Sequence, residues 1–327
     1  MMAHRYRAPL AVVFLLLFQG CTRKSVNRTL QQSIPPMQNT TRMLAVYEPW
    51  FGHRRHISVG YSSTDPAVLR RQIDQAKTLG ISGFVVDWYG QREPLLDRSY
   101  ALLQSIAAET NFQVAMMYDE RGGSNGEPAT DETLAEFEEF RKTYLAPDAP
   151  GRQAYLTYNE HPVIFIFPKG GHTDWSRVRA EVQNWNPVPL LIYEYRSAPV
   201  GAAFDGMYAW VNPGQKGWAR DGSNWGEDYL RNFYRKMRSK YADKVAVGAA
   251  WAGFDDTKAS WGLNRHMSQR CGNTFKDTLE LSRQYDTADR PLPFLLIETW
   301  NDYEEGTAIE RGLARCNADS RQVPSPQ

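Results

Sequence analysis

The 327-residue sequence is poor in cysteine and has no excess of charge of either sign. Its 3 cysteines form no Cys-x-x-Cys pair and no cluster with histidine, so the sequence predicts no zinc site. With 38 basic against 37 acidic side chains, it lacks the basic field that nucleic-acid binding needs. It also has no HExxH or P-loop motif, and no GxGxxG after the first predicted strand. We therefore expect no metal, no cofactor and no nucleic-acid partner.

One apolar run stands near the N-terminus, and it is too short to span a bilayer as a mature helix. The run is "LAVVFLLLF", residues 10–18, and it follows His4, Arg5 and Arg7. Gln19, Gly20 and Cys21 come next, so the segment resembles a bacterial lipoprotein signal with Cys21 as the lipidated first mature residue. A plain secretory signal is the alternative. Because Thr22 rather than Asp follows the cysteine, we expect an outer-membrane lipoprotein of the cell envelope, facing the periplasm or the exterior.

The predicted organisation is a signal peptide (1–20), a polar tether (21–42), one barrel domain (43–316) and a disordered tail (317–327). The tether is rich in Gln, Asn, Ser and Thr, a composition that cannot bury a core. If Cys21 is lipidated, Cys271 and Cys316 remain, and in an oxidising compartment they either form one disulfide or stay free.

After the tether, apolar runs alternate with amphipathic segments. Eight runs read as strands: 43–50, 82–90, 112–122, 161–170, 189–196, 204–213, 244–256 and 294–306. Six segments read as helices: 65–80, 94–110, 131–145, 173–185, 224–241 and 274–286. Eight strands that mostly alternate with helices predict a (β/α)8 TIM barrel, in which the active site lies at the C-terminal ends of the strands. A doubly wound sheet is the alternative fold.

Carboxylates and aromatic residues recur at those strand ends. Aromatic faces stack on sugar rings, carboxylates bind hydroxyl groups, and a pair of acids serves proton transfer at a glycosidic bond. We expect His53 and His56, in the first loop, to contact substrate rather than a metal. The candidate substrate-binding residues are Tyr47, Trp50, Asp87, Trp88, Asp119, Glu120, Tyr193, Trp251 and Trp300.

The end of the eighth run carries the most specific motif, "WNDYEEGTAIE", residues 300–310. It resembles the late motif of glycoside hydrolase family 99, the endo-α-mannosidases, and its "WNDY" resembles family 71, the α-1,3-glucanases. The earlier "GISGF" and "VVDWYG" are similar to the second-strand region of the same families.

The resemblance places the two catalytic acids of family 99 on Asp302 and Glu305. It implies that Asp302 deprotonates the 2-hydroxyl of the sugar, with an epoxide-like intermediate, and that Glu305 protonates the leaving oxygen. Family 99 has Glu at the first position and family 71 has Asp, so Asp302 favours family 71, whereas "EGTAIE" favours family 99. Activation of a water by Asp302 stays open. Glu304 ranks behind both, because the family spacing selects Glu305.

The sequence thus predicts a monomeric glycoside hydrolase that acts on an α-linked oligosaccharide or polysaccharide, an α-mannan or an α-glucan. A non-catalytic glycan-binding lipoprotein on the same barrel is the alternative. It would keep the aromatic residues but would not require two acids spaced by three, so Asp302 and Glu305 favour the enzyme. We expect the protein to contact the membrane only through its lipid anchor.

The anchor can be tested directly. Cys21→Ser should leave the protein soluble in the periplasm or unprocessed, because the lipid chain is what holds an exported protein at the membrane. Cell fractionation and intact-mass measurement would show this. Wild-type protein in the soluble fraction, with no lipid mass on residue 21, would contradict the prediction.

Overall fold

The computed structural model describes residues 41–120, 129–169, 173–195, 201–212 and 224–314. Its main element is a closed barrel of eight parallel strands, and each of the eight predicted runs overlaps one of them. The ring closes where β1 pairs with β11 and where β3 pairs with β5. The strands are β1 (Arg42–Tyr47), β2 (Ile81–Trp88), β3 (Gln113–Asp119), β5 (His161–Phe167), β6 (Leu190–Glu194), β7 (Gly206–Tyr208), β8 (Val245–Trp251) and β11 (Phe294–Glu298).

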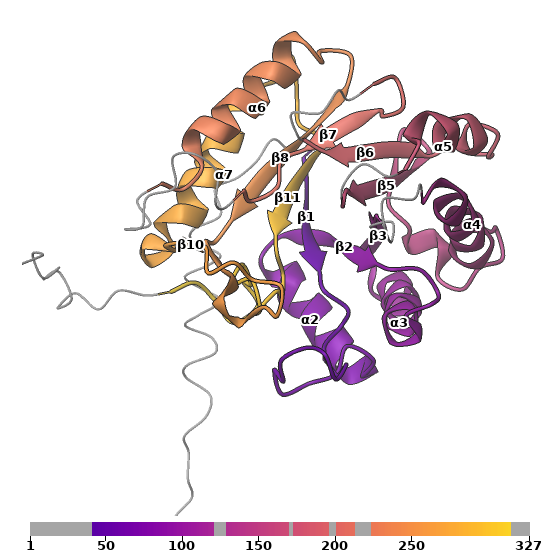
Figure 1. Ribbon diagram of the computed structural model, residues 1–327, viewed down its shortest axis with the longest axis horizontal. Helices are drawn as coiled ribbons and strands as arrows, with labels where there is room; N and C mark the ends of the chain where they lie inside the picture. Colours follow the sequence, from indigo (N-terminus) through magenta and orange to yellow (C-terminus); the bar gives the residue numbers. More distant parts are fainter. Residues whose placement is uncertain (1–40, 121–128, 170–172, 196–200, 213–223, 315–327) are drawn as a thin grey trace, which may run out of the picture.

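Six α-helices lie in the described ranges, and they surround the strand ring on its outside (Figure 1). Between β6 and β7, and after β11, the described residues form no α-helix. The prediction of a (β/α)8 barrel is confirmed, with six α-helices in the described ranges. The helices are α2 (Pro66–Thr78), α3 (Pro94–Thr110), α4 (Thr130–Phe140), α5 (Trp175–Val182), α6 (Glu227–Ser239) and α7 (Asn273–Tyr285).

Local signals set where these helices begin and end. Asp65 caps α2 by accepting a hydrogen bond of 2.8 Å from the backbone N–H of Ala67, and Pro66 occupies the first turn. Gly80 follows the helix with a φ of 80°, a left-handed conformation that glycine adopts without strain. Such caps fix the lengths of the βα connections, and those connections carry the functional residues.

The core has two layers, separated by the strands. The inner layer takes one or two residues from each of the eight strands: Leu44, Val46, Val85, Ala115, Met117, Val163, Phe165, Ile192, Tyr208, Val247, Phe294 and Leu296. The outer layer combines the opposite faces of most strands with the apolar stripes of α2, α3, α4, α5 and α7. Because strand side chains alternate between faces, a shift of one position decides whether a residue faces the barrel interior or a helix.

Of the predicted domain boundaries, only the one between the tether and the barrel lies within the described residues. Arg42, predicted as the end of the tether, already belongs to β1, and its side chain donates a 2.7 Å hydrogen bond to the carbonyl of Thr157. The predicted signal peptide with Cys21, the rest of the tether except Thr41, and the tail lie outside the described residues. In the described ranges, no helix is both long and apolar enough to cross a membrane.

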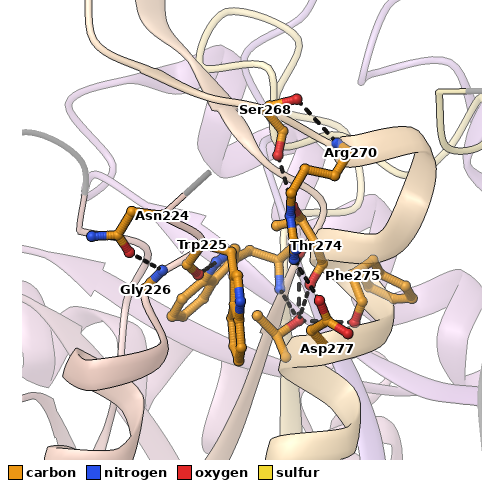
Figure 2. Close-up of polar contacts among 10 residues, drawn as sticks. Asn224, Trp225, Gly226, Ser268, Arg270, Thr274, Phe275 and Asp277 are labelled. Atoms are coloured by element: carbon orange, nitrogen blue, oxygen red, sulfur yellow. Dashed lines mark hydrogen bonds and ion pairs between the residues drawn. The ribbon is translucent and has the colours of Figure 1, made fainter. Parts of the chain in front are cut away.

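The turn before α7 is fixed by a polar cluster, shown in Figure 2. Arg270 lies 2.6 Å from Asp277 and donates a 3.0 Å hydrogen bond to the hydroxyl of Thr274. Its guanidinium also lies 5.7 Å from the ring centroid of Trp225, in the connection before α6. The next residue, Cys271, is disulfide-bonded. Cys316 lies outside the described residues, so a bond between these two cysteines stays a prediction.

A chain without residues 1–40 retains only Cys271 and Cys316. After denaturation without reductant it should show no free thiol, and Cys316→Ser should expose Cys271. Loss of the bond should cost roughly 2–4 kcal/mol of unfolding free energy, because the unfolded chain gains freedom. Thiol titration and chemical denaturation check this. Recovery of two free thiols, or of Cys271 joined to Cys21 in the full chain, would contradict the pairing.

Candidate active site

A cavity of about 530 Å³ opens among the connections that follow the C-terminal ends of the barrel strands. Seven residues expected from the sequence to contact substrate or to act in catalysis line it: Trp50, His53, His56, Asp87, Asp119, Asp302 and Glu305. The other lining residues in the described ranges are Glu48, Arg55, Tyr89, Glu93, Leu96, Met117, Phe167, Lys169, Trp210, Ser260 and Trp261. Residues at or after the C-terminal ends of β1, β2, β3 and β11 thus meet at one cavity.

Strand alternation explains which acids reach the cavity floor. Glu48 comes two residues after Val46, an inner-layer residue of β1, so its side chain continues the inward row. Asp87 and Asp119 continue the inward rows of β2 and β3 in the same way. On these three adjacent strands, the apolar inner layer thus ends in carboxyl groups.

The floor is buried and rich in carboxyl groups. Burial raises the pKa of Glu48 and of Asp87 well above the usual range. Repulsion from Asp87 adds to the shift of Glu48, and repulsion from Asp119 adds to that of Asp87, whereas hydrogen bonding of Asp87 with Tyr89 and Glu48 works in the opposite direction. Burial also raises the pKa of Asp119, although the ammonium of Lys169, 2.7 Å away, opposes that shift. The Lys169 ammonium also lies 5.1 Å from the ring centroid of Tyr89.

Asp302 lies in the turn that follows β11, and it is 3% exposed. Its Oδ1 accepts hydrogen bonds of 2.9 and 2.8 Å from the backbone N–H groups of Glu304 and Glu305. These bonds close a tight turn and fix the start of the segment that carries the second acid. Burial raises the pKa of Asp302 well above its usual range, and the charge of Glu305 raises it further.

Glu305 meets an aromatic side chain from a different connection. The indole N–H of Trp261 donates a 2.9 Å hydrogen bond to Oε1 of Glu305. Burial raises the pKa of Glu305, while this bond works in the opposite direction because it favours the charged carboxylate. The ring of Trp261 packs edge-on against Trp50, with centroids 6.1 Å apart, and 43% of the residue stays exposed.

The loop that presents Trp261 runs from β9 (Phe254–Asp255) to β10 (His266–Met267). Asp256 organises it from a fully buried position. Its carboxylate accepts hydrogen bonds from the backbone N–H groups of Leu263 and Arg265 and from the guanidinium of Arg265, at 3.0, 2.7 and 2.7 Å. A rigid loop can hold the indole N–H at a fixed distance from Glu305.

Glu304, between the two acids, has a different environment. Its Oε2 lies 2.6 Å from Nδ1 of His56, and its Oε1 accepts a 3.2 Å hydrogen bond from the backbone N–H of Ile57. Glu304 is 2% exposed and holds the β1–α2 connection. The imidazole of His56 in turn stacks on Trp50, with centroids 4.8 Å apart and planes 8° apart. Both oxygens of Glu304 are therefore occupied inside the protein.

Four predicted substrate-binding residues lie in the outer core layer and do not line the cavity: Tyr47, Trp88, Tyr193 and Trp300. The Tyr47 hydroxyl donates to Gln72 of α2 at 2.9 Å, and the Trp88 indole donates to Asp97 of α3 at 3.1 Å. These placements correct the expectation of sugar contact. Each residue lies at or near the C-terminal end of a strand, but its side chain is on the side that packs against the helices.

Trp251 and Glu120 are also placed away from the cavity. The Trp251 ring is buried, and its N–H donates a 3.0 Å hydrogen bond to the carbonyl of Trp225. Gly226, with a φ of 87°, lets this ring approach, since a Cβ there would lie 2.8 Å from it. The carboxylate of Glu120 accepts hydrogen bonds from the backbone N–H groups of Lys169 and Thr173, at 2.8 and 3.3 Å. Both residues thus hold neighbouring connections in place.

The predicted set lacked several residues that line the cavity, notably Glu48, Tyr89, Lys169, Trp210 and Trp261. Counting alternate positions from the strand centres would have found Glu48, because it continues the inward row of β1. No sequence signal marks Trp261, which reaches Glu305 through a long connection.

No family model matches the chain. The human glycoprotein endo-α-1,2-mannosidase-like protein is 24% identical over 273 residues, which cover 78% of this chain and 56% of that protein. The mouse protein of the same name is also 24% identical over 273 residues, 78% of this chain and 57% of its own length. The chain thus spans little more than half the length of the curated relatives that it matches.

Solved structures give a likeness of fold. The family 99 endo-α-mannosidase from Bacteroides thetaiotaomicron, in complex with bis-tris propane, has a TM-score of 0.63 at 19% identity, with 82% of this chain and 86% of that chain covered. A structure described as a glycoside hydrolase-like protein has a TM-score of 0.62 at 15% identity, covering 85% and 88%. The fold of this chain is therefore a (β/α)8 barrel like that of the Bacteroides enzyme, and its sequence resembles the endo-α-1,2-mannosidase-like proteins over 78% of its length.

Proposed function

We propose that this chain is a glycoside hydrolase that cleaves α-linked glycans, an α-mannan or an α-glucan, with Asp302 and Glu305 as its catalytic acids. One observation carries the proposal. Two carboxyl groups of the same turn, the buried Asp302 and the half-buried Glu305, line one cavity among the strand-end connections, beside the indoles of Trp50 and Trp261. The sequence resemblance of residues 300–310 to the late motif of family 99 supports the same pair.

Glu305 is suited to the role of general acid. A proton donor must still hold its proton near neutral pH, and burial of Glu305 raises its pKa in that direction. Protonation of the glycosidic oxygen by Glu305 makes the leaving group neutral as the bond to the anomeric carbon breaks.

Asp302 is suited to the partner role. Its Oδ1 is held by two backbone N–H groups, so Oδ2 is the oxygen that we assign to the reacting sugar. There it would remove a proton either from the 2-hydroxyl of the substrate or from the attacking water.

Aromatic side chains would hold the sugar rings. Trp50 is packed on His56 and meets the edge of Trp261, so the two indoles offer faces at 78° to each other. Sugar rings stack by their C–H faces on such surfaces, and the partly exposed Trp261 would cover a ring bound at Glu305. We also propose that the protein works at the bacterial cell envelope, anchored through Cys21.

The catalytic assignment predicts a strong effect of Glu305→Gln. This change keeps the shape of the side chain but removes its proton, so turnover of α-mannan or α-glucan should fall by roughly a hundredfold or more. Substrates with good leaving groups should be partly spared, because they need less protonation, whereas Asp302→Asn should show no such rescue. Released oligosaccharides and rates on activated glycosides provide the measurement.

Glu304→Gln is the matched control. It removes a carboxylate from the same turn, but one whose oxygens are engaged with His56 and Ile57. It should cost much less activity than Glu305→Gln. If Glu304→Gln abolished turnover while Glu305→Gln did not, the assignment of the acid would be wrong. If no α-glycan were cleaved but several were bound, the glycan-binding alternative would hold.

The indole of Trp261 should set the alkaline limit of activity. Trp261→Phe removes the hydrogen bond that favours charged Glu305, so the pKa of the acid should rise. Because a general acid works in its protonated form, the alkaline limb of kcat/KM should then move to higher pH. A pH–rate profile measures the shift.

Trp50→Phe is the control for this shift. The Trp50 indole nitrogen is buried and has no hydrogen-bond partner among the described residues. The change should therefore weaken substrate binding through lost stacking and leave the alkaline limb in place. Equal shifts in both variants, or no shift in Trp261→Phe, would contradict the role given to the Trp261 N–H group.

A further inference from the structure

Two carboxyl groups of the cavity floor have no part in the proposed proton transfers. Glu48 and Asp87 are 3% and 7% exposed, and both line the cavity. One oxygen of each, Oε2 of Glu48 and Oδ1 of Asp87, is buried without a hydrogen-bond partner among the described residues. Buried acceptors without a donor are costly and rare, so this pair calls for a ligand that donates hydrogen bonds.

The same cavity already contains one ammonium group, that of Lys169, beside a carboxylate and an aromatic ring. The Nζ of Lys169 lies 2.7 Å from Oδ2 of Asp119 and 5.1 Å from the ring centroid of Tyr89. Asp119 thus has a cation at hydrogen-bond distance. The charge of Lys169 also acts on Asp87 and Glu48, but from farther away, because in the described ranges neither acid forms an ion pair with it. A carboxylate beside an aromatic face is an effective site for an ammonium ion.

The acids of the cavity also favour a cation, because a positive charge beside a buried carboxyl group stabilises its charged form. The described lining of the cavity holds six carboxyl groups, those of Glu48, Asp87, Glu93, Asp119, Asp302 and Glu305, against the side chains of Arg55 and Lys169 and two histidines. A cleft lined mainly by one sign of charge concentrates ligands of the opposite sign. A uronic acid or a phosphorylated sugar is therefore disfavoured.

We propose that Glu48 and Asp87 bind the protonated amine of a 2-amino-2-deoxyhexose, so that the glycan substrate contains amino sugar without its acetyl group. The inference rests on the proposed function and names a feature of its substrate. An ammonium group donates up to three hydrogen bonds, so it can donate to Oε2 of Glu48 and to Oδ1 of Asp87 at the same time. A hydroxyl group donates only one hydrogen bond. Acetylation of the nitrogen removes the charge.

Binding can be measured apart from hydrolysis. The full chain in detergent, carrying Glu305→Gln to prevent turnover, is titrated in a calorimeter with methyl α-glycosides of glucose and mannose. The 2-amino-2-deoxy and 2-acetamido-2-deoxy forms of both glycosides are then titrated in the same way. At least one amino sugar should bind about tenfold or more tightly than its parent and its acetylated form, since hydrogen bonds to charged groups are the stronger ones.

Charge-removing variants then locate the preference. Glu48→Gln and Asp87→Asn keep the side-chain shapes, and either change should bring the affinity ratio of amino sugar to parent sugar close to one. Glu93→Gln, a half-buried carboxyl of the same cavity, should keep the ratio. Thermal unfolding of each variant verifies that it is folded. If one of the two substitutions prevents folding, the other variant still tests the preference.

The outcomes separate this inference from the proposed function. No preference for either amino sugar, or a preference that survives both Glu48→Gln and Asp87→Asn, overturns the inference, even if the wild-type protein cleaves α-glycans. A preference lost in those two variants and kept in Glu93→Gln supports it, even if no hydrolysis is ever found.

Discussion

The burial of several carboxyl groups together, at the end of an apolar barrel interior, is the constraint on which the site depends. Inward rows of apolar residues on β1, β2 and β3 end in Glu48, Asp87 and Asp119, and the turn after β11 adds Asp302 and Glu305. Taking these groups out of water disfavours their charged forms, and mutual repulsion adds to the effect. The folded protein therefore holds protons that the unfolded chain releases. The contribution of these groups to stability should be fully present below the ordinary carboxyl range and should be lost as the pH rises through the raised pKa values.

Within that constraint, three acids of one turn have three different environments. Asp302 is bonded to the backbone of its own turn, Glu304 to the β1–α2 connection, and Glu305 to the indole of Trp261. The chemistry assigned to each follows from these partners rather than from the residue type. Asp256 affects the environment of Glu305 indirectly, because it holds the loop that carries Trp261.

The sequence predicted the scaffold well because its signals are local. The segment 94–110 was read as a helix from its own pattern, and α3 spans Pro94–Thr110. Strands could be recognised as apolar runs between turns, but several are apolar on both faces, so the inward direction could not be read from them. For that reason Tyr47 and Trp88 were assigned to the cavity, whereas their neighbours Glu48 and Asp87 line it. The contact between Trp261 and Glu305 joins positions 44 residues apart, and no local pattern encodes it.

Titration of the carboxyl groups tests the central claim most directly. In protein labelled with ¹³C at its Asp and Glu side-chain carboxyls, NMR signals can be followed from acidic to alkaline pH and assigned through Glu48→Gln, Asp87→Asn, Asp302→Asn and Glu305→Gln. The account predicts that the signals lost in these variants titrate above the ordinary range for Asp and Glu, while those of exposed acids titrate within it. If every carboxyl signal, including these four, titrated in the ordinary range, the buried and partly protonated site described above would not exist.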